Sequence, residues 1–359
     1  LASAKHPVVI TEYAGRDRAC IQRLVDLAET LSMTVIETGS TGYMNFPRNH
    51  PLHGGYDPAS ALQEADVVLL LGAILPWHPP SRGPGASTRV AVLDENPLRT
   101  DLPYWGYKMD LCLTGNIAES LALLQKALVP LLPGMAIDRD SRRLRIAQET
   151  ERRRGAWREQ AAQCARSAPI DTRWAIHELN DILPANAMVV EETITHRIAV
   201  HQYLDRVQAG CYFAGCIGGL GTGLGTALGV KVATPEKPVI CLIGDGSFHY
   251  DPALAALGFC QEHHLPILIV LLNNHGYLSQ KSGVPRHFPN GWAVRSKRFI
   301  GTSITPSPDY PMIARAYGGY GETVMDPSEV RHALRRGLDA IEQGQLALVE
   351  IRLQPVNPA

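Results

Sequence analysis

The chain has 359 residues, which is enough for two domains that each have a hydrophobic core. Its 34 basic and 35 acidic residues nearly cancel, so the overall charge gives no reason to expect binding to nucleic acid or to an anionic membrane. No apolar run reaches the length of a membrane span, and the seven cysteines are scattered without a C-x-x-C pair. We therefore expect a cytoplasmic protein with reduced, mostly buried thiols.

Short apolar runs alternate with helical stretches over residues 1–129. The pattern predicts strands at Pro7–Ile10, Met33–Ile36, Ala65–Leu71 and Arg89–Leu93, and helices at Asp17–Leu31 and Asn116–Leu128. This alternation is typical of an α/β domain with a parallel sheet. No G-x-G-x-x-G sequence follows any of these strands, so a dinucleotide site in this domain is not supported.

Residues 130–168 differ in character, because a helix that begins near Asp138 is rich in arginine. A basic run can mark a nucleic-acid-binding patch. The interspersed acidic residues favour a solvated helix between two domains instead: Asp140, Glu149, Glu151 and Glu159. We expect residues 130–168 to form a linker helix.

Residues 169–359 predict a second α/β domain, which ends in a strand over Leu346–Leu353. Within it, a strand at Val239–Ile243, a helix at Pro252–His264 and a strand at Ile267–Leu272 form a β-α-β unit. Such units are parallel and right-handed. Because ligands of open parallel sheets bind beyond the carboxyl ends of the strands, we expect Asp245 and Asn274 to lie close together there.

The residue types at these strand ends suit a metal and a phosphate. A carboxylate, an amide oxygen and loop carbonyls form an oxygen-only ligand set of the kind that binds Mg²⁺. Gly244 and Gly246 would let backbone amides approach the phosphates. Taken singly, the motifs have plainer interpretations: Asp-Gly as a turn, Asn-Asn as a loop, and the glycines of residues 215–229 as tight packing.

Gly244–Ser247, followed by Asn273-Asn274, resembles the diphosphate-binding motif of thiamine-diphosphate enzymes, in particular the benzoylformate decarboxylase and acetolactate synthase group. Val189–Thr195 resembles the strand-end segment whose backbone touches the diphosphate. Ala214–Gly221 resembles the loop whose bulky residue lies under the cofactor and keeps it bent. Residues 90–97 with 110–116 resemble the family's middle domain. The three cofactor motifs occur in the family's order, which favours a cofactor site over the plainer interpretations.

The resemblance implies two domains with parallel sheets flanked by helices: a Rossmann-like middle domain over 1–129 and a thiamine-diphosphate-binding fold over 169–359. It implies thiamine diphosphate and Mg²⁺ as cofactors. The metal would be bound by the side chains of Asp245 and Asn274 and the carbonyl of Gly276, and Leu220 would lie under the cofactor. The implied cofactor-binding residues are Glu192, Thr193, Ile194, Thr195, Gly218, Gly219, Leu220, Gly244, Asp245, Gly246, Ser247, Asn274, Gly276, Tyr277 and Leu278.

The resemblance also implies a function. The chain would be the diphosphate- and Mg²⁺-binding subunit of an acetolactate synthase-like lyase or transferase, a decarboxylase or carboligase of a small 2-oxo acid. In the family, the activating glutamate lies on a pyrimidine-binding domain, and no segment here resembles its glutamate-bearing helix. We therefore assign no catalytic residue within the chain. We expect a partner chain, or another part of a longer polypeptide, to supply the glutamate in an oligomeric assembly.

Two other functions stay open at this point. The chain could belong to a flavin-containing oxidase or synthase of the same family, with FAD or ADP in the middle domain, or it could be a regulatory subunit that binds the cofactor without turnover. The sequence identifies neither the substrate nor whether the reaction is decarboxylation or carboligation.

Overall fold

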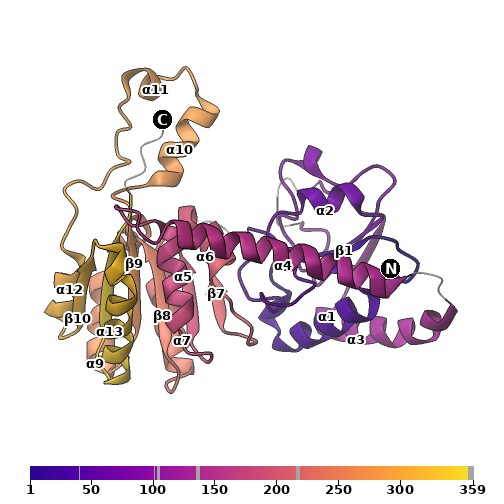
Figure 1. Ribbon diagram of the computed structural model, residues 1–359, viewed down its shortest axis with the longest axis horizontal. Coiled ribbons are helices and arrows are strands. Elements are labelled where there is room, and N and C mark those ends of the chain that lie inside the picture. Colours follow the sequence, from indigo (N-terminus) through magenta and orange to yellow (C-terminus); the bar gives the residue numbers. More distant parts are fainter. Residues whose placement is uncertain (40, 101, 103–105, 135–137, 216–218, 355–359) are drawn as a thin grey trace. The chain divides into compact units, whose positions relative to one another are not determined.

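The structure is a computed structural model that describes residues 1–359 apart from 40, 101, 103–105, 135–137, 216–218 and 355–359. The chain divides into two compact units: Leu1–Ala156 with Asp205–Cys211, and Trp157–Leu204 with Tyr212–Ala359. Each unit contains one parallel sheet flanked by helices (Figure 1), which confirms the predicted fold class.

The sheet of the first unit has the strand order β2-β1-β3-β4-β5, and all neighbouring strands are parallel. From β1 the chain goes first to one side of the sheet and then to the other, so the order reverses between β1 and β3. The strands are β1 Pro7–Thr11, β2 Thr34–Glu37, β3 Val67–Leu71, β4 Arg89–Asp94 and β5 Leu111–Thr114.

Helices cover both faces of this sheet because successive strand residues point to opposite faces. On one face, Leu24 of α1 (Arg18–Leu31) and Leu121 of α3 (Ile117–Leu128) join the core that contains Val9. On the other, Leu62 of α2 (Ala59–Glu64) packs with Val8 and Ile10. Short 3₁₀ turns complete the unit: Ala14–Arg16, Pro80–Arg82 and Val129–Gly134.

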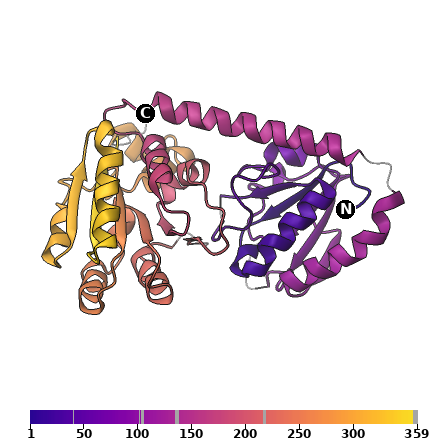
Figure 2. The same ribbon diagram turned by 60° about the horizontal axis from the view of Figure 1, so that its bottom comes forward.

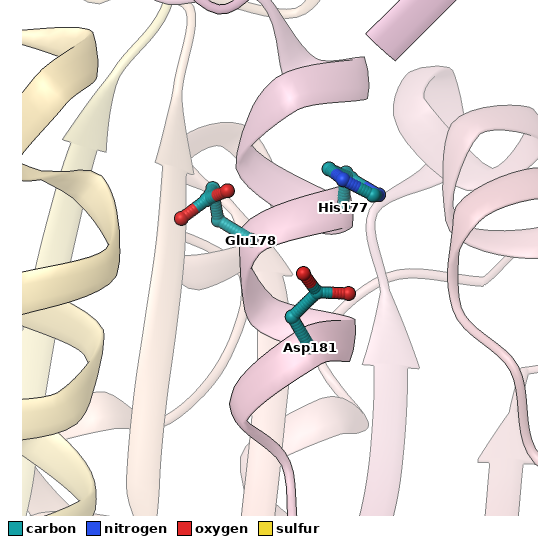
Figure 3. A group of neighbouring side chains, drawn as sticks. All are labelled: His177, Glu178 and Asp181. Atoms are coloured by element: carbon teal, nitrogen blue, oxygen red, sulfur yellow. The ribbon is translucent and has the colours of Figure 1, made fainter. Parts of the chain in front are cut away.

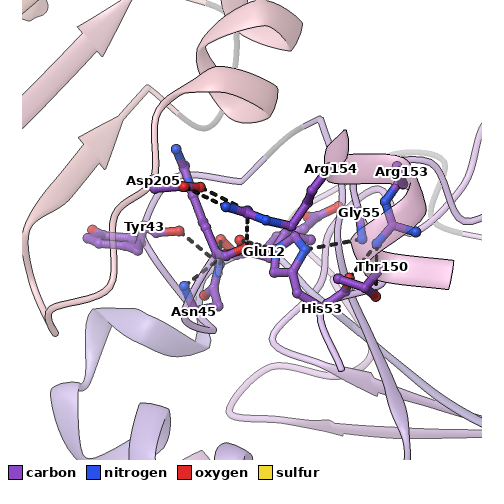
Figure 4. Close-up of polar contacts among 11 residues, drawn as sticks. Glu12, Tyr43, Asn45, His53, Gly55, Thr150, Arg153, Arg154 and Asp205 are labelled. Carbon is purple, nitrogen blue, oxygen red and sulfur yellow. Dashed lines mark hydrogen bonds and ion pairs between the residues drawn. The ribbon is translucent and has the colours of Figure 1, made fainter. Parts of the chain in front are cut away.

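Helix α4 (Arg139–Gln163) contains the predicted arginine-rich stretch, and the division between the two units falls inside it. The domain boundaries inferred near residues 129 and 169 therefore stay predictions. The expectation of a solvated helix is wrong for Arg142, whose buried guanidinium donates to the carbonyls of Leu31 and Ser32 at the end of α1. Arg154 forms an ion pair with Asp205 (Figure 4).

The second unit has the strand order β10-β11-β9-β8-β6-β7, again with all neighbours parallel. Here the chain leaves β6 for β7 on one side and then continues to β8 on the other, so the order reverses between β6 and β8. The strands are β6 Met188–Glu192, β7 Tyr212–Ala214, β8 Val239–Gly244, β9 Leu268–Asn273, β10 Tyr320–Val324 and β11 Ala347–Arg352.

Helices also cover both faces of this second sheet (Figures 1 and 2). One face packs against α7 (Gly223–Ala233), α9 (Ala253–His263) and α12 (Tyr310–Ala316), and the other against α5 (Thr172–Ile182) and α13 (Val330–Glu342). Helices α10 (Leu278–His287) and α11 (Trp292–Ser296) lie beyond the carboxyl end of β9 (Figure 1). The remaining elements are α6 Arg197–Tyr203, α8 Asp245–Phe248 and the 3₁₀ turns Ile194–His196 and Pro327–Glu329. No helix within the described ranges is long and apolar enough to cross a membrane.

Candidate cofactor site

A pocket lies at the carboxyl ends of β6 and β8, where the strand order of the second unit reverses. Open parallel sheets bind their ligands at this kind of position. All but three of the predicted cofactor-binding residues line it, and they are joined by three further residues: His196, Ser279 and Gln280. The structure thus brings together segments that the sequence separates by up to about ninety positions.

The three exceptions are Glu192, Gly218 and Gly219. The carboxylate of Glu192 is buried and accepts hydrogen bonds from backbone N–H groups at the start of α7, so its side chain does not face the pocket. Gly219 is exposed and does not line the pocket. Gly218 lies outside the described residues.

Asp245 directly follows β8 and is only 2% exposed. Its Oδ2 atom accepts a hydrogen bond of 2.8 Å from the backbone N–H of Gly276. Burial raises the pKa of Asp245 to about 6, because the low-polarity surroundings disfavour its charged form. A Cβ atom on Gly276 would lie 2.3 Å from the carbonyl oxygen of Thr302, so only glycine lets this loop approach Asp245.

Asn274 is oriented by His196, a residue that is not among the predicted cofactor-binding residues. The Asn274 Nδ2 atom lies 3.1 Å from His196 Nε2, and His196 Nδ1 lies 2.9 Å from the Thr172 hydroxyl. Burial lowers the pKa of His196 to about 4, so the ring is neutral at pH 7 and carries one proton. We assign that proton to Nδ1, which leaves Nε2 to accept from the Asn274 amide.

This orientation leaves Asn274 Oδ1 buried and without a hydrogen-bond partner among the described residues. Together with the carboxylate of Asp245 and the carbonyl of Gly276 it offers only oxygen ligands, which suits Mg²⁺. Buried acceptors are normally satisfied, so an orphaned amide oxygen beside a buried carboxylate is consistent with a cation site.

The backbone around the pocket is strained at two positions. Ile194 and His275 have φ values of 41° and 62°, in the left-handed region that disfavours β-branched and bulky residues. Strain of this kind concentrates at ligand-binding sites. A Cβ atom on Gly246 would lie 2.8 Å from the Tyr277 ring, so glycine is also required there.

His196 could have been found from its position, because it ends the same 3₁₀ turn that contains Ile194 and Thr195. Its contact with Asn274 spans 78 positions and is not visible as a motif.

A second group of candidate metal ligands lies on α5: His177, Glu178 and Asp181 (Figure 3). One ligand atom of each lies within 4.8 Å of the others. However, Arg331 of α13 donates to Glu178 at 2.6 Å and to Asp181 at 2.9 Å. Both carboxylates are therefore already bound by an arginine, and this group is better explained as an ion-pair network between two helices.

Comparisons with known proteins identify the family of this chain. The central domain of thiamine pyrophosphate enzymes matches residues 1–124, and their C-terminal TPP binding domain matches residues 194–351. The large subunit of acetolactate synthase isozyme 3 from Escherichia coli K12 is 25% identical over 370 residues, which cover 98% of this chain and 60% of that protein. Benzoylformate decarboxylase from Pseudomonas aeruginosa is 26% identical over 344 residues, which cover 93% and 58% of the two chains.

Among solved structures, thiamine diphosphate-dependent 4-hydroxybenzoylformate decarboxylase from Rhodococcus jostii RHA1 superposes with a TM-score of 0.77 at 24% identity. The match covers 98% of this chain and 62% of that one, and it shows the shared fold. The chain thus spans about three-fifths of the length of the relatives it matches. It belongs to the thiamine pyrophosphate enzymes and contains the central and C-terminal domains of that family.

Proposed function

We propose that this chain binds the diphosphate of thiamine diphosphate together with Mg²⁺, as part of an oligomeric, cytoplasmic C–C lyase or transferase that acts on a small 2-oxo acid. The observation that carries the proposal is the pocket in which buried Asp245 and the orphaned Oδ1 of Asn274 meet at the strand-order reversal. The printed names of the relatives, a decarboxylase and the large subunit of a synthase, support the reaction class and the assembly.

The residues of the chain would bind and orient the cofactor. Asp245, Asn274 and the carbonyl of Gly276 would hold the metal, and the backbone of residues 193–195 and 244–247 would contact the diphosphate. Leu220 would support the rings from below. When bound, thiamine diphosphate supplies a nucleophilic carbon and takes up the electrons of the C–C bond that breaks.

Titration calorimetry on the 359-residue chain tests this proposal. We expect thiamine diphosphate to bind when Mg²⁺ is present and to bind far more weakly after the metal is removed by a chelator, since the diphosphate would share the ion with Asp245. Equal binding with and without Mg²⁺, or no binding in either condition, would contradict the proposal.

His196→Ala should weaken Mg²⁺ binding in the presence of thiamine diphosphate by about tenfold or more, as is typical for residues that orient metal ligands. The variant removes the acceptor that binds Asn274 Nδ2 and that leaves Oδ1 as the free ligand atom of the amide. His332→Ala is a suitable control, because His332 is exposed on α13. Equal Mg²⁺ affinity in wild type and His196→Ala would show that His196 does not orient Asn274.

The flavin-containing alternative is disfavoured by the first unit. Its strand order reverses between β1 and β3, where a nucleotide would be expected to bind. That position is taken by Glu12 (Figure 4), which is 2% exposed. Its carboxylate accepts from the Thr38 hydroxyl at 2.6 Å and from the N–H groups of Ile74 and Leu75 at 2.5 and 3.0 Å. These amides are unavailable to a phosphate, and the carboxylate would repel one.

We accordingly expect the purified protein to contain no flavin. An absorption spectrum of the protein, and of the supernatant after acid precipitation, measures this directly. Flavin recovered in an amount close to that of the protein would overturn our interpretation of Glu12 and favour an oxidase or flavin-containing synthase.

A further inference from the structure

The amino end of α7 is held by two carboxylates from other parts of the second unit. Glu192 at the end of β6 accepts from the N–H groups of Gly221 at 2.6 Å, Thr222 at 3.2 Å and Gly223 at 2.5 Å. Asp251 accepts from the N–H of Leu224 at 3.0 Å. The first N–H groups of a helix have no partner inside the helix. Here Glu192 and Asp251 bind the first two N–H groups of α7, those of Gly223 and Leu224, and the two N–H groups that precede them.

The two carboxylates are close neighbours, because they accept from consecutive N–H groups, those of Gly223 and Leu224. Burial and the neighbouring charge of Glu192 raise the pKa of Asp251 to about 7, because two adjacent buried carboxylates cannot both ionise without a large cost. Asp251 Oδ2 is buried, and no donor in the described part of the chain reaches it. A proton on Asp251 turns this unsatisfied acceptor into a donor to Glu192.

The same contacts determine where Leu220 lies. Leu220 lines the cofactor pocket and directly precedes Gly221, whose N–H is bound by Glu192. Gly221 has a φ of 93°, and a Cβ atom there would lie 2.6 Å from the Tyr250 carbonyl oxygen. The loop is therefore confined between the end of β6 and the turn that contains Tyr250 and Asp251.

We propose that Glu192 and Asp251, sharing one proton, are positioning residues that hold residues 221–224 in place and so fix Leu220 in the cofactor pocket. The inference rests on the proposed function only where it makes Leu220 a contact of the cofactor. Loss of the shared proton would leave two carboxylates that repel each other, and the N–H groups at the start of α7 would be released.

The other ionisable groups on the elements around Glu192 and Asp251 do not account for a release of the N–H groups of residues 221–224 near pH 7. Glu191 on β6 is bound by Arg197, and Lys231 of α7 donates to the carbonyls of Pro235 and Lys237. Burial raises the pKa of the Cys241 thiol well above its usual value and that of Cys260 to about 12. On α8 and just after it, Asp245 has a pKa of about 6, and burial lowers the pKa of His249.

Asp251→Asn is the decisive variant, because its amide can donate to Glu192 at every pH while its oxygen still accepts from Leu224. Hydrogen exchange of peptides spanning residues 219–226 is measured by mass spectrometry on the 359-residue chain without cofactor. At about pH 6.5 we expect equal protection in wild type and variant. At about pH 8.5 the wild type should exchange on the order of tenfold faster than the variant, since each pH unit above the pKa changes the protonated fraction about tenfold.

Two further variants sharpen the comparison. Glu192→Gln should lose protection at both pH values, because its NH₂ group would face backbone N–H groups. Asp17→Asn is the matched control: Asp17 caps the exposed start of α1, and its change should leave residues 219–226 unaffected. Equal exchange of wild type and Asp251→Asn at about pH 8.5 would overturn the proposal.

An infrared titration of the wild type keeps the proposal testable if a variant fails to fold. At about pH 6.5 Asp245, with its pKa of about 6, is already mostly ionised, so we expect a protonated carboxyl band at that pH to come mainly from Asp251 and to be lost by about pH 8.5. Its absence at the lower pH would overturn the shared proton. Titration with thiamine diphosphate and Mg²⁺ then separates the two proposals. We expect binding to weaken at about pH 8.5 in the wild type but not in Asp251→Asn. If no cofactor binds while the exchange pattern holds, the proposed function fails and the positioning of residues 221–224 stands.

Discussion

Asp245→Asn is expected to abolish Mg²⁺-dependent binding of thiamine diphosphate, with a loss of affinity of about 100-fold or more. The substitution keeps the side-chain volume, and the amide oxygen can still accept from the N–H of Gly276. It removes the single charged ligand of the proposed site. Calorimetric titration of wild type and variant with thiamine diphosphate and Mg²⁺ measures the effect, and equal affinities would contradict the metal assignment.

The raised pKa of Asp245 allows two further tests of the metal assignment, one from protein stability and one from the pH dependence of Mg²⁺ affinity. Burial raises this pKa to about 6, so the folded apo chain binds the proton of Asp245 more tightly than the unfolded chain does. Ionisation of Asp245 at neutral pH therefore opposes folding. Asp245→Asn should therefore be no less stable than wild type at pH 7 in the absence of metal. In the wild type, Mg²⁺ affinity should fall by up to about tenfold per pH unit below pH 6, as protons compete for the carboxylate.

Asp309→Asn provides the control for a general effect of removing an aspartate. Asp309 caps the start of α12 by accepting from the N–H of Met312, and it is exposed. We expect its change to leave both the Mg²⁺ affinity and its pH dependence unaltered. A wild-type affinity that stays constant between about pH 5 and 7 would show that Asp245 is not a ligand, whatever the behaviour of the variants.

Much of the fold was predictable because the central strands are buried on both faces and appear as continuous apolar runs. Strands β8 and β9 were located within one residue at each end. Two helix starts were visible because Asp17 and Asn116 accept from backbone N–H groups of their own first turns. Helix α10 was not predicted, since it contains Pro285 and buries only Leu278. Its position depends on tertiary contacts rather than on local pattern.

The parts of the candidate site that lie at strand ends were predictable. The parts that depend on side-chain contacts between segments far apart in the sequence were not. Asp245 and Asn274 follow adjacent parallel strands, so their proximity follows from the topology. The roles of His196 and Glu192 required the folded structure. The His196 contact joins residues 78 positions apart, and Glu192 binds N–H groups about 30 positions away. Its neighbour Thr193 does line the pocket, so the predicted segment reaches the pocket although the Glu192 side chain does not.

A second large effect is expected on turnover, because the described part of the pocket lacks an acidic group that turnover requires. Among the residues that line the pocket, Asp245 is the only carboxylate, and the proposed metal requires it. The pocket as described thus offers no acidic group to hold the pyrimidine ring of the cofactor in its reactive form. The resemblance assigns that role to a glutamate on a pyrimidine-binding domain, supplied by a partner chain or by another part of a longer polypeptide.

We expect the 359-residue chain alone to release no CO₂ from 2-oxo acids above the background rate, even with thiamine diphosphate and Mg²⁺ bound. Addition of a matching pyrimidine-binding domain should raise the rate by at least about 100-fold, the usual scale of a positioned acid or base, and changing its glutamate to glutamine should remove that gain. Asp245→Asn in the present chain should remove it as well, which ties turnover to this pocket. A regulatory subunit would instead bind the cofactor and stay inactive with every such partner. Turnover by the chain alone would show that a carboxylate among its own 359 residues reaches the pyrimidine ring.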